Sequence, residues 1–196
     1  MYKRSIKRSM DLILALILFP FIFIISIFIA VLILCDDRGP IFYKGERLGE
    51  KGKVFKMYKF RSMKVNAPDL RNEDGSTFNS EKDYRLTKIG GILRKTSLDE
   101  LPQIINVIAG NMSFVGPRPD LPEHITYYSK EELKKLTVKP GITGYNQAFY
   151  RNSIEWKERL KNDVYYSDHL SILFDLKILV VTLINVLNKK GIYKNV

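Results

Sequence analysis

The stretch LILALILFPFIFIISIFIAVLILC, at residues 12–35, decides how the chain is organised. Its 24 residues carry no charge, whereas charged residues make up 27% of the whole chain. A helix with a rise of about 1.5 Å per residue would be roughly 36 Å long here, enough to cross a hydrocarbon core of about 30 Å. The stretch therefore predicts a membrane helix, and the basic remainder of the chain predicts a folded domain outside the membrane.

A cleavable signal peptide is one alternative for this stretch. The apolar part of a signal peptide is usually about 7–15 residues long, and small residues at a cleavage site follow it. Here the apolar stretch is longer, and the charged sequence CDDR at residues 35–38 follows it. We therefore interpret residues 1–37 as a retained membrane segment and residues 38–196 as a second, folded domain.

Both flanks of the apolar stretch are positively charged. The basic residues before it are Lys3, Arg4, Lys7 and Arg8, and those that follow closely are Arg38, Lys44, Arg47, Lys51 and Lys53. Positive charge prefers the cytoplasmic side of a membrane, and Pro20 removes a backbone hydrogen bond inside the helix. These features favour a re-entrant helix that bends near Pro20 and returns to the face it entered. A spanning helix remains the alternative, because membrane helices tolerate proline.

The net charge of +11, with a pI near 9.6, indicates an anionic partner such as nucleic acid, anionic lipid or a phosphorylated substrate. Residues 38–64 contain nine basic and only two acidic residues, and they follow the apolar stretch, where anionic headgroups would lie. Cys35 is the only cysteine, so no disulfide can form within the chain. His124 and His169 are too far apart for a histidine-based metal site. A bound metal would therefore have oxygen ligands, which favours Mg²⁺ or Mn²⁺.

Beyond residue 37 the sequence predicts a mostly helical α+β domain. Strand-forming residues at 41–43 and 54–60 flank a glycine-containing segment and predict a small β-hairpin. The segments with helical patterns are residues 86–93, 101–109, 131–136 (a surface helix), 154–166 and 170–187. The last of them is apolar with polar interruptions, which is typical of an amphipathic helix at a membrane interface or against a core. The prolines at 114–122 predict a stiff extended loop, and residues 139–144 predict a turn.

Two adjacent carboxylates, Asp99 and Glu100, lie in the sequence TSLDELP at residues 96–102. One interpretation is structural, because Ser97 and Glu100 fit a capping box and acidic residues are favoured in the first turn of a helix. The other interpretation is chemical, because a carboxylate kept ionised at a helix N-terminus suits a nucleophile or a metal ligand. The pair alone leaves both interpretations open.

Three arginines support the chemical interpretation. Arg94 lies just before the acid pair, Arg118 lies between two prolines in GPRP at residues 116–119, and Arg151 follows a turn rich in glycine and tyrosine. A site for phosphate transfer needs cations that hold a diphosphate and a metal that neutralises developing charge. Arginine suits bidentate contacts with phosphate. Each arginine alone is typical of a protein surface, so the prediction depends on their combination with the acid pair.

A series of motifs runs from residue 7 to residue 189: KRSMD at 7–11, KFRSM at 59–63, LRKTSLDELPQ at 93–103, NV at 106–107, NMSFVGPRP at 111–119, KPGITG at 139–144, RN at 151–152 and DVYY at 163–166. In these motifs and their spacing the chain resembles the bacterial sugar transferase family, specifically its small, PglC-like monotopic phosphoglycosyl transferases. The resemblance implies a re-entrant membrane helix at residues 1–37 and a catalytic domain at residues 38–196, on the cytoplasmic face of the bacterial inner (plasma) membrane.

The resemblance also implies a two-step reaction that initiates a glycoconjugate such as capsule, O-antigen, exopolysaccharide or a glycoprotein glycan. Asp99 would attack the sugar-bearing phosphate of a UDP-sugar and release UMP, and polyprenyl (undecaprenyl) phosphate would then take the phosphosugar from Asp99. Glu100 would accept a proton or arrange Mg²⁺, so both acids are candidate catalytic residues and metal ligands. The candidate substrate-binding residues are Arg94, Arg118, Arg151, Lys59, Arg61 and Asp163.

The partners implied are the UDP-sugar, the polyprenyl phosphate and anionic phospholipid, and the interpretation admits downstream glycosyltransferases and a homodimer. Many members of the family carry Trp-Ala-Gln and Gly-Arg-Asn after the turn at 139–144, whereas this chain has YNQAFYRN at 145–152. The resemblance therefore does not assign the sugar. A nucleic-acid-binding protein is a rival that explains the charge but not the apolar stretch, and the sequence has no nucleic-acid-binding motif. A membrane-surface scaffold, in which Asp99 and Glu100 only cap a helix, is the second rival.

Overall fold

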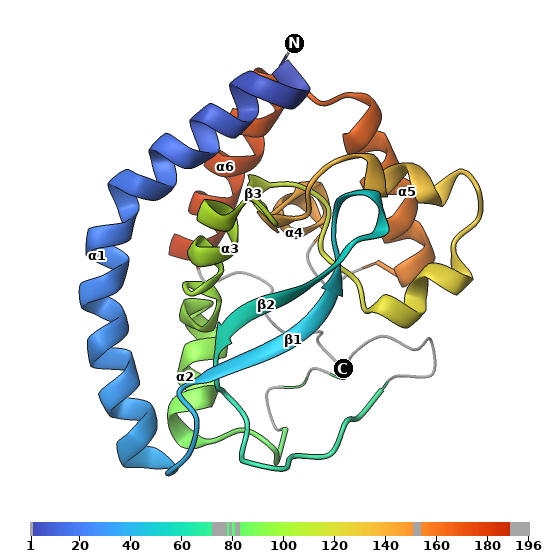
Figure 1. Ribbon diagram of the computed structural model, residues 1–196. Helices are drawn as coiled ribbons and strands as arrows, with labels where there is room; N and C mark the ends of the chain where they lie inside the picture. Colours follow the sequence, from blue (N-terminus) through green and yellow to red (C-terminus); the bar gives the residue numbers. More distant parts are fainter. Residues whose placement is uncertain (1, 72–77, 79, 81–82, 151–153, 189–196) are drawn as a thin grey trace.

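The computed structural model describes residues 2–71, 78, 80, 83–150 and 154–188 (Figure 1). Its α-helices are α1 (Lys7–Asp36), α2 (Lys88–Thr96), α3 (Gln103–Ala109), α4 (Tyr145–Phe149), α5 (Trp156–Asp168) and α6 (Ile172–Leu187). Its strands are β1 (Phe42–Leu48), β2 (Val54–Phe60), β3 (Ser113–Val115) and β4 (Gly141–Thr143). The short helices are a π-helical turn η1 (Tyr2–Ile6) and the 3₁₀ helices η2 (Glu50–Gly52), η3 (Leu98–Glu100), η4 (Pro122–Tyr127) and η5 (Glu132–Thr137). The predicted fold, mostly helical with a small β-hairpin, is confirmed.

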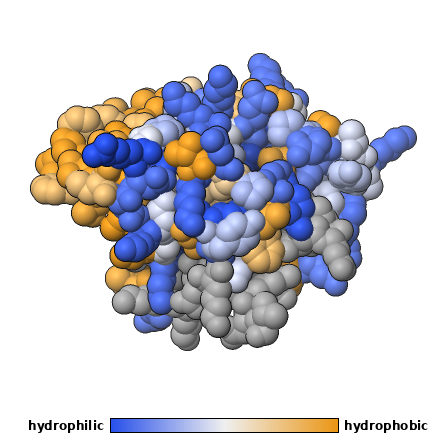
Figure 2. Space-filling view, turned by 90° about the horizontal axis from the view of Figure 1, so that it is seen from below, coloured by the Kyte–Doolittle hydropathy of each residue, from blue (hydrophilic) through white to orange (hydrophobic). Residues whose placement is uncertain are grey.

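Helix α1 contains the whole apolar stretch and continues through Pro20. It runs along one side of the molecule and bends part-way along its length (Figure 1). By length and composition it is the one helix of the described part of the chain that could cross a membrane. Most of its large apolar side chains are exposed, and Figure 2 shows hydrophobic residues gathered on the side where α1 lies. The predicted long apolar N-terminal helix is confirmed, and it could be membrane-associated. Its re-entrant path stays a prediction.

Polar contacts fasten the N-terminal end of α1 to the rest of the protein. The Nζ atom of Lys7 lies 2.5 Å from Oδ2 of Asp175 in α6, and both side chains are buried. Arg8 donates hydrogen bonds to the carbonyl oxygens of Val107 and Ile108, at 2.6 and 2.9 Å. These carbonyls belong to the last turn of α3, where a cation is favoured because the C-terminal end of a helix is partially negative.

A second set of contacts fastens the C-terminal end of α1. Asp36 accepts a hydrogen bond from the backbone N–H of Ile89 in α2 at 2.8 Å. Arg61, just after β2, donates to the carboxylate and the carbonyl of Asp37 and to the carbonyl of Pro40. The two ends of one 30-residue helix are thus held by the same folded body.

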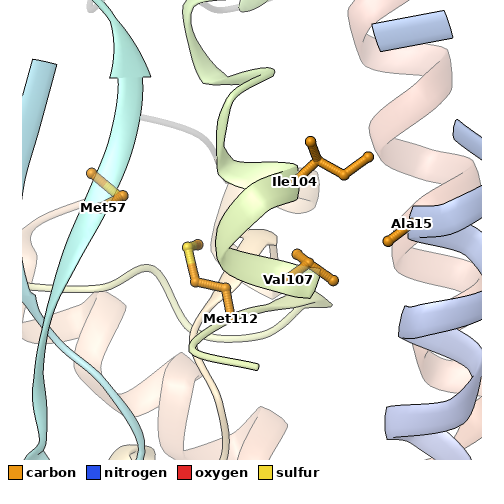
Figure 3. Packing of buried hydrophobic residues seen from close by; sticks show 5 residues of the cluster. All are labelled: Ala15, Met57, Ile104, Val107 and Met112. Atoms are coloured by element: carbon orange, nitrogen blue, oxygen red, sulfur yellow. The ribbon is translucent and has the colours of Figure 1, made fainter. Parts of the chain in front are cut away.

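Buried apolar side chains form three clusters, and α1 takes part in two of them. One cluster joins Ala15 of α1 to Met57, Ile104, Val107 and Met112 (Figure 3). Another joins Ile29 and Ile33 of α1 to Phe60 and Leu93, and the third contains Val115, Val138, Ala148, Tyr166 and Ile178. The side chain of Ala15 is fully buried, so this small residue allows α1 to lie close to α3. The boundary predicted at residue 37 stays a prediction, and α1 shares its buried face with the rest of the chain.

The hairpin of β1 and β2 is antiparallel and pairs Phe42 with Phe60 and Leu48 with Val54. Its first strand is longer than the predicted 41–43, because the ladder continues to Leu48. Gly45, which the sequence placed between the strands, therefore lies within β1, opposite Met57.

The predicted turn at 139–144 is wrong, because residues 141–143 form strand β4, which pairs in parallel with β3. Two glycines permit this pairing. A Cβ on Gly116 would lie 2.3 Å from the carbonyl oxygen of Lys139, and a Cβ on Gly141 would lie 2.1 Å from the nitrogen of Gly116. The predicted surface helix at 131–136 is also corrected. It is the 3₁₀ helix η5, and it buries the side chain of Lys135.

Candidate active site

The acid pair lies in η3, the single helical turn between α2 and α3. Ser97 has a left-handed backbone conformation (φ 58°) and ends α2, and its N–H donates to the carbonyl of Arg94. Its side chain makes no capping hydrogen bond to η3, and the side chain of Glu100 instead pairs with Lys59 of β2. The capping box that the sequence allowed is therefore not formed, so capping does not explain the two acids.

Glu100 is held by two cations from different elements. Nζ of Lys59 lies 2.6 Å from Oε1 of Glu100, and Nη1 of Arg118 lies 3.6 Å from the same oxygen. Burial alone would raise the pKa of Glu100, but the charges of Lys59 and Arg118 outweigh burial and lower the pKa to about 2. Glu100 is therefore a permanent anion that brings the two cations to the same place.

Asp99 has different surroundings from its neighbour. It is only 8% exposed, and it accepts no hydrogen bond from any residue that the structure describes. Burial raises the pKa of Asp99, and the positive charge of Lys59 opposes that rise. A carboxylate with few stabilising contacts is a better nucleophile than one that is saturated with hydrogen bonds.

Apolar contacts place the acid pair beside the membrane helix. Leu98 and Leu101, on either side of the pair, pack against the cluster that contains Ile29 and Ile33 of α1. Figure 1 shows the corresponding end of α1 next to α2. The apolar residues around the acids therefore tie a charged site to the C-terminal end of the apolar helix.

Three of the predicted substrate-binding residues lie at the acid pair: Lys59, Arg94 and Arg118. Arg94 is in the last turn of α2, where its Nε donates to Oγ of Ser62 at 2.9 Å, and its charge acts on Asp99. The side chain of Arg118 is 52% exposed, so its guanidinium can move to contact a ligand. These two arginines and Lys59 surround the acid pair with positive charge.

The other three predicted residues lie elsewhere or outside the described residues. Arg61 is directed at Asp37 and Pro40, at the end of α1. Asp163 of α5 is buried and pairs with Lys135, in a network that has no contact with the acid pair among the described side chains. Arg151 lies outside the described residues. Arg61 and Asp163 therefore make contacts that hold other parts of the fold together, and they do not lie at the acid pair.

The sequence did not single out Lys135, although its ammonium is one of the most buried charges in the protein. It lies in the charged sequence EELKKL at residues 131–136, which is typical of a solvent-exposed surface. No local signal distinguishes Lys135 from Lys134, because its partners Asp120 and Asp163 come from distant parts of the chain.

The acid pair has the donor set for an oxygen-bound metal but is not a preformed cage. No group of three or more His, Cys, Asp or Glu side chains is found among the described residues. Lys59 and Arg118 both approach Oε1 of Glu100, which leaves Oε2 and the carboxylate of Asp99 for other ligands. Mg²⁺ is often held by one or two carboxylates together with substrate phosphates and water, and these two acids fit that arrangement.

The model of the family described as bacterial sugar transferase matches residues 2–189. The chain is 41% identical over 187 residues to an uncharacterized sugar transferase, EpsL, of Bacillus subtilis, which covers 95% of this chain and 90% of that protein. It is 37% identical over 198 residues to the UDP-glucose:undecaprenyl-phosphate glucose-1-phosphate transferase of Escherichia coli. It is 35% identical over 201 residues to the undecaprenyl-phosphate galactose phosphotransferase of Salmonella typhimurium. Each of these two alignments covers 97% of this chain but only 42% of the longer relative. The prediction from the motifs is confirmed, and the chain belongs to the bacterial sugar transferase family.

Proposed function

We propose that this sugar transferase is a phosphoglycosyl transferase that moves a phosphosugar from a UDP-sugar to a polyprenyl phosphate and releases UMP. This reaction would be the first membrane step in the biosynthesis of a glycan. The names of the Escherichia coli and Salmonella relatives give undecaprenyl phosphate as their acceptor. The same names give glucose for one protein and galactose for the other. The class of donor and acceptor is therefore proposed for this chain, and the individual sugar is not.

The observation that carries this proposal is the position of Asp99. It is a buried carboxylate without a hydrogen bond from the described residues, and the charges of Lys59, Arg94 and Arg118 act on it. It also lies beside the end of an apolar helix that could enter a membrane. A nucleophile, phosphate-binding cations and access to a lipid are the features that this transfer requires.

The reaction takes place in two displacements at one phosphorus. An oxygen of Asp99 attacks the sugar-bearing phosphorus of the UDP-sugar. The bond between this phosphorus and the oxygen that bridges the two phosphates breaks, and UMP leaves with the bonding electrons. A phosphate oxygen of the polyprenyl phosphate then attacks the same phosphorus, and the bond to Asp99 breaks. The carboxylate of Asp99 is regenerated, so the protein ends unchanged.

The cations around the acid pair stabilise the negative charge of the diphosphate during both displacements. Arg118 has a half-exposed side chain and suits a bidentate contact with a phosphate. Lys59 holds Glu100 at 2.6 Å and places its own positive charge beside Asp99. Arg94, fixed by Ser62, supplies a second guanidinium for the phosphates.

We assign Mg²⁺ to this site as its metal. Asp99 and Glu100 would hold it together with the diphosphate of the donor, as their donor atoms allow. When bound, Mg²⁺ would supply positive charge that neutralises the phosphate oxygens.

We also propose that α1 is re-entrant and that the catalytic body lies on the cytoplasmic face of the bacterial inner membrane. A straight helix of 30 residues is about 45 Å long, so a spanning helix would put its two ends on opposite faces. The contacts Lys7–Asp175 and Asp36–Ile89 instead fasten both ends to one body, which favours a common face. The basic segment at residues 38–64 suits anionic phospholipid there. A homodimer and contacts with downstream glycosyltransferases stay predictions.

UMP release tests the proposed function. The purified protein in lipid nanodiscs with undecaprenyl phosphate and Mg²⁺ is given UDP-glucose, UDP-galactose and their N-acetylated forms, each in turn. We expect UMP from at least one donor, and a loss of at least about 10³-fold in Asp99→Asn, because an amide is not a nucleophile here. The control Asp168→Asn, an exposed change in α5, should keep full activity. Turnover that survives in Asp99→Asn would contradict the assigned nucleophile.

A further inference from the structure

We propose that Lys135 is a positioning residue, which acts with Tyr128: both bind Asp120, fix the loop at residues 117–120 and thereby hold Arg118 at the acid pair. The inference rests on the proposed function, since it gives Arg118 a contact with the phosphates of the donor. It also gives a role to Asp163, which the sequence placed at the substrate.

Lys135 joins three separate parts of the chain. Its side chain is 3% exposed, and its Nζ lies 2.6 Å from Oδ2 of Asp120 and 2.7 Å from Oδ2 of Asp163 in α5. The same Nζ donates a longer hydrogen bond, 3.4 Å, to the carbonyl oxygen of Arg118. Burial alone would lower the pKa of Lys135, but the two carboxylates outweigh burial and raise it, so the ammonium stays charged.

Further bonds hold the other partners of Lys135. Tyr128 donates its hydroxyl to Oδ2 of Asp120 at 2.5 Å, and Asn146 of α4 donates to Oδ1 of Asp163 at 2.7 Å. The lysine is therefore the centre of a buried network that reaches α4, α5 and the segment between η4 and η5.

The backbone on both sides of Arg118 is fixed. The carbonyl of Pro117 accepts a hydrogen bond from Gly141 of β4 at 2.9 Å, and the carbonyl of Asp120 accepts one from Leu48 of β1 at 2.8 Å. Pro117 and Pro119 also restrict the backbone torsion angles of this loop. The loop is thus held by the parallel sheet, by the hairpin and by Lys135.

The side chain of Arg118 has much less support than its backbone. It is 52% exposed, and its Nη1 atom lies 3.6 Å from Oε1 of Glu100. A long and exposed side chain reaches a phosphate with the right geometry only if its backbone is placed accurately. For this reason a loosening of Asp120 should lower activity mainly through Arg118, and not through a general loss of structure.

The obvious variant, Lys135→Met, would leave the buried carboxylates of Asp120 and Asp163 without their cation, and it is expected to destabilise the fold strongly. A milder variant is Tyr128→Phe, which removes one hydrogen bond to Asp120 and keeps the ring and the lysine. Its control is Tyr127→Phe, because the neighbouring tyrosine is 62% exposed.

A double-mutant cycle of Tyr128→Phe and Arg118→Ala tests the inference. The readouts are kcat and KM for the UDP-sugar that releases most UMP, with the melting temperature of each variant. We expect Tyr128→Phe to lower kcat/KM about 5- to 20-fold when Arg118 is present and less than about twofold in the Arg118→Ala background, because the two changes act on one contact. Tyr127→Phe should change neither value.

An equal loss in both backgrounds would overturn the inference, since Tyr128 would then act independently of Arg118. A normal kcat/KM in Arg118→Ala, or in Tyr128→Phe, would overturn it as well. An unmodified protein that releases no UMP from any of the donors would instead contradict the proposed function. The two failures are therefore distinguishable.

Discussion

At the scale of single residues, the two adjacent acids have opposite surroundings. Glu100 is paired with Lys59 and approached by Arg118, whereas Asp99 receives no hydrogen bond from the described residues. The pKa of Glu100 is lowered to about 2, and that of Asp99 is raised by burial. This difference supports the proposal that Asp99 is the nucleophile and that Glu100 organises charge.

Removing the partner of Glu100 tests this division. We expect Lys59→Met to lower the free energy of unfolding by about 1–3 kcal/mol, because a largely buried carboxylate loses its closest cation. The double variant Lys59→Met with Glu100→Gln should regain most of that stability but not the UMP release. Chemical denaturation in detergent and the UMP assay measure the two effects. The control Lys56→Met, at an exposed position of the same strand, should change neither the free energy of unfolding nor UMP release. If Lys59→Met also left both unchanged, the account would be contradicted.

The sequence predicted the acid pair and its cations, but it did not predict what each residue contacts. Lys59 and Arg61 both belong to the family-like motif KFRSM at residues 59–63, so both were assigned to the substrate. Strand β2 ends at Phe60, however, and Arg61 turns to the end of α1. The role of Lys135 could not be predicted, because its partners come from distant segments.

At the scale of elements, the site depends on the close approach of α2 to the segment after β2. A Cβ on Gly90 would lie 1.9 Å from the carbonyl oxygen of Ser62, and the hydroxyl of Ser62 accepts the hydrogen bond from Arg94. Gly90 therefore allows α2 to bring Arg94 to the acid pair. The neighbouring Gly91 faces open space.

These two glycines form a matched pair for mutation. Gly90→Ala should lower the free energy of unfolding by about 2–3 kcal/mol or more, because the backbone of Ser62 must move, and UMP release should fall as Arg94 is displaced. Gly91→Ala should raise stability by up to about 1 kcal/mol, since alanine is the better helix former. Similar effects of the two substitutions, measured by thermal unfolding, would show that the approach of α2 is not needed.

Most elements could be predicted from local patterns, within a few residues at their ends. The apolar stretch predicted α1, and the helical pattern at residues 101–109 predicted α3, which ends at Gly110 with a left-handed backbone (φ 84°). The parallel pairing of β3 with β4 could not be predicted, because each strand has three residues and no alternating pattern. The capping box failed for a local reason, since Ser97 adopts a left-handed conformation that ends α2.

At the scale of the whole molecule, one apolar helix is fastened at both ends to a basic body. The charge pattern predicted a common face for the two ends, and the contacts of Lys7 and Asp36 support that hypothesis independently. In Figure 2 hydrophobic residues gather on the side of the molecule where α1 lies, and hydrophilic residues cover much of the rest of that face. A protein built in this way would keep its active site at the membrane surface.

Cysteine labelling tests the path of α1. The single cysteine, Cys35, is replaced by serine, and single cysteines are introduced as Ser5→Cys, Arg38→Cys and Lys161→Cys, all at exposed positions. With a membrane-impermeant maleimide, we expect all three to react in inside-out vesicles and none in right-side-out vesicles. Reaction of Ser5→Cys and Arg38→Cys from opposite sides would show that α1 spans the bilayer.

The central claim is that Asp99 carries the phosphosugar between two substrates. The most direct measurement is mass spectrometry of the protein after incubation with its UDP-sugar and Mg²⁺, without polyprenyl phosphate. The account predicts a mass increase equal to one phosphosugar, located on Asp99 by fragmentation, lost when polyprenyl phosphate is added and not formed in Asp99→Asn. An adduct on another residue, or rapid transfer to polyprenyl phosphate by the Asp99→Asn protein, would contradict it.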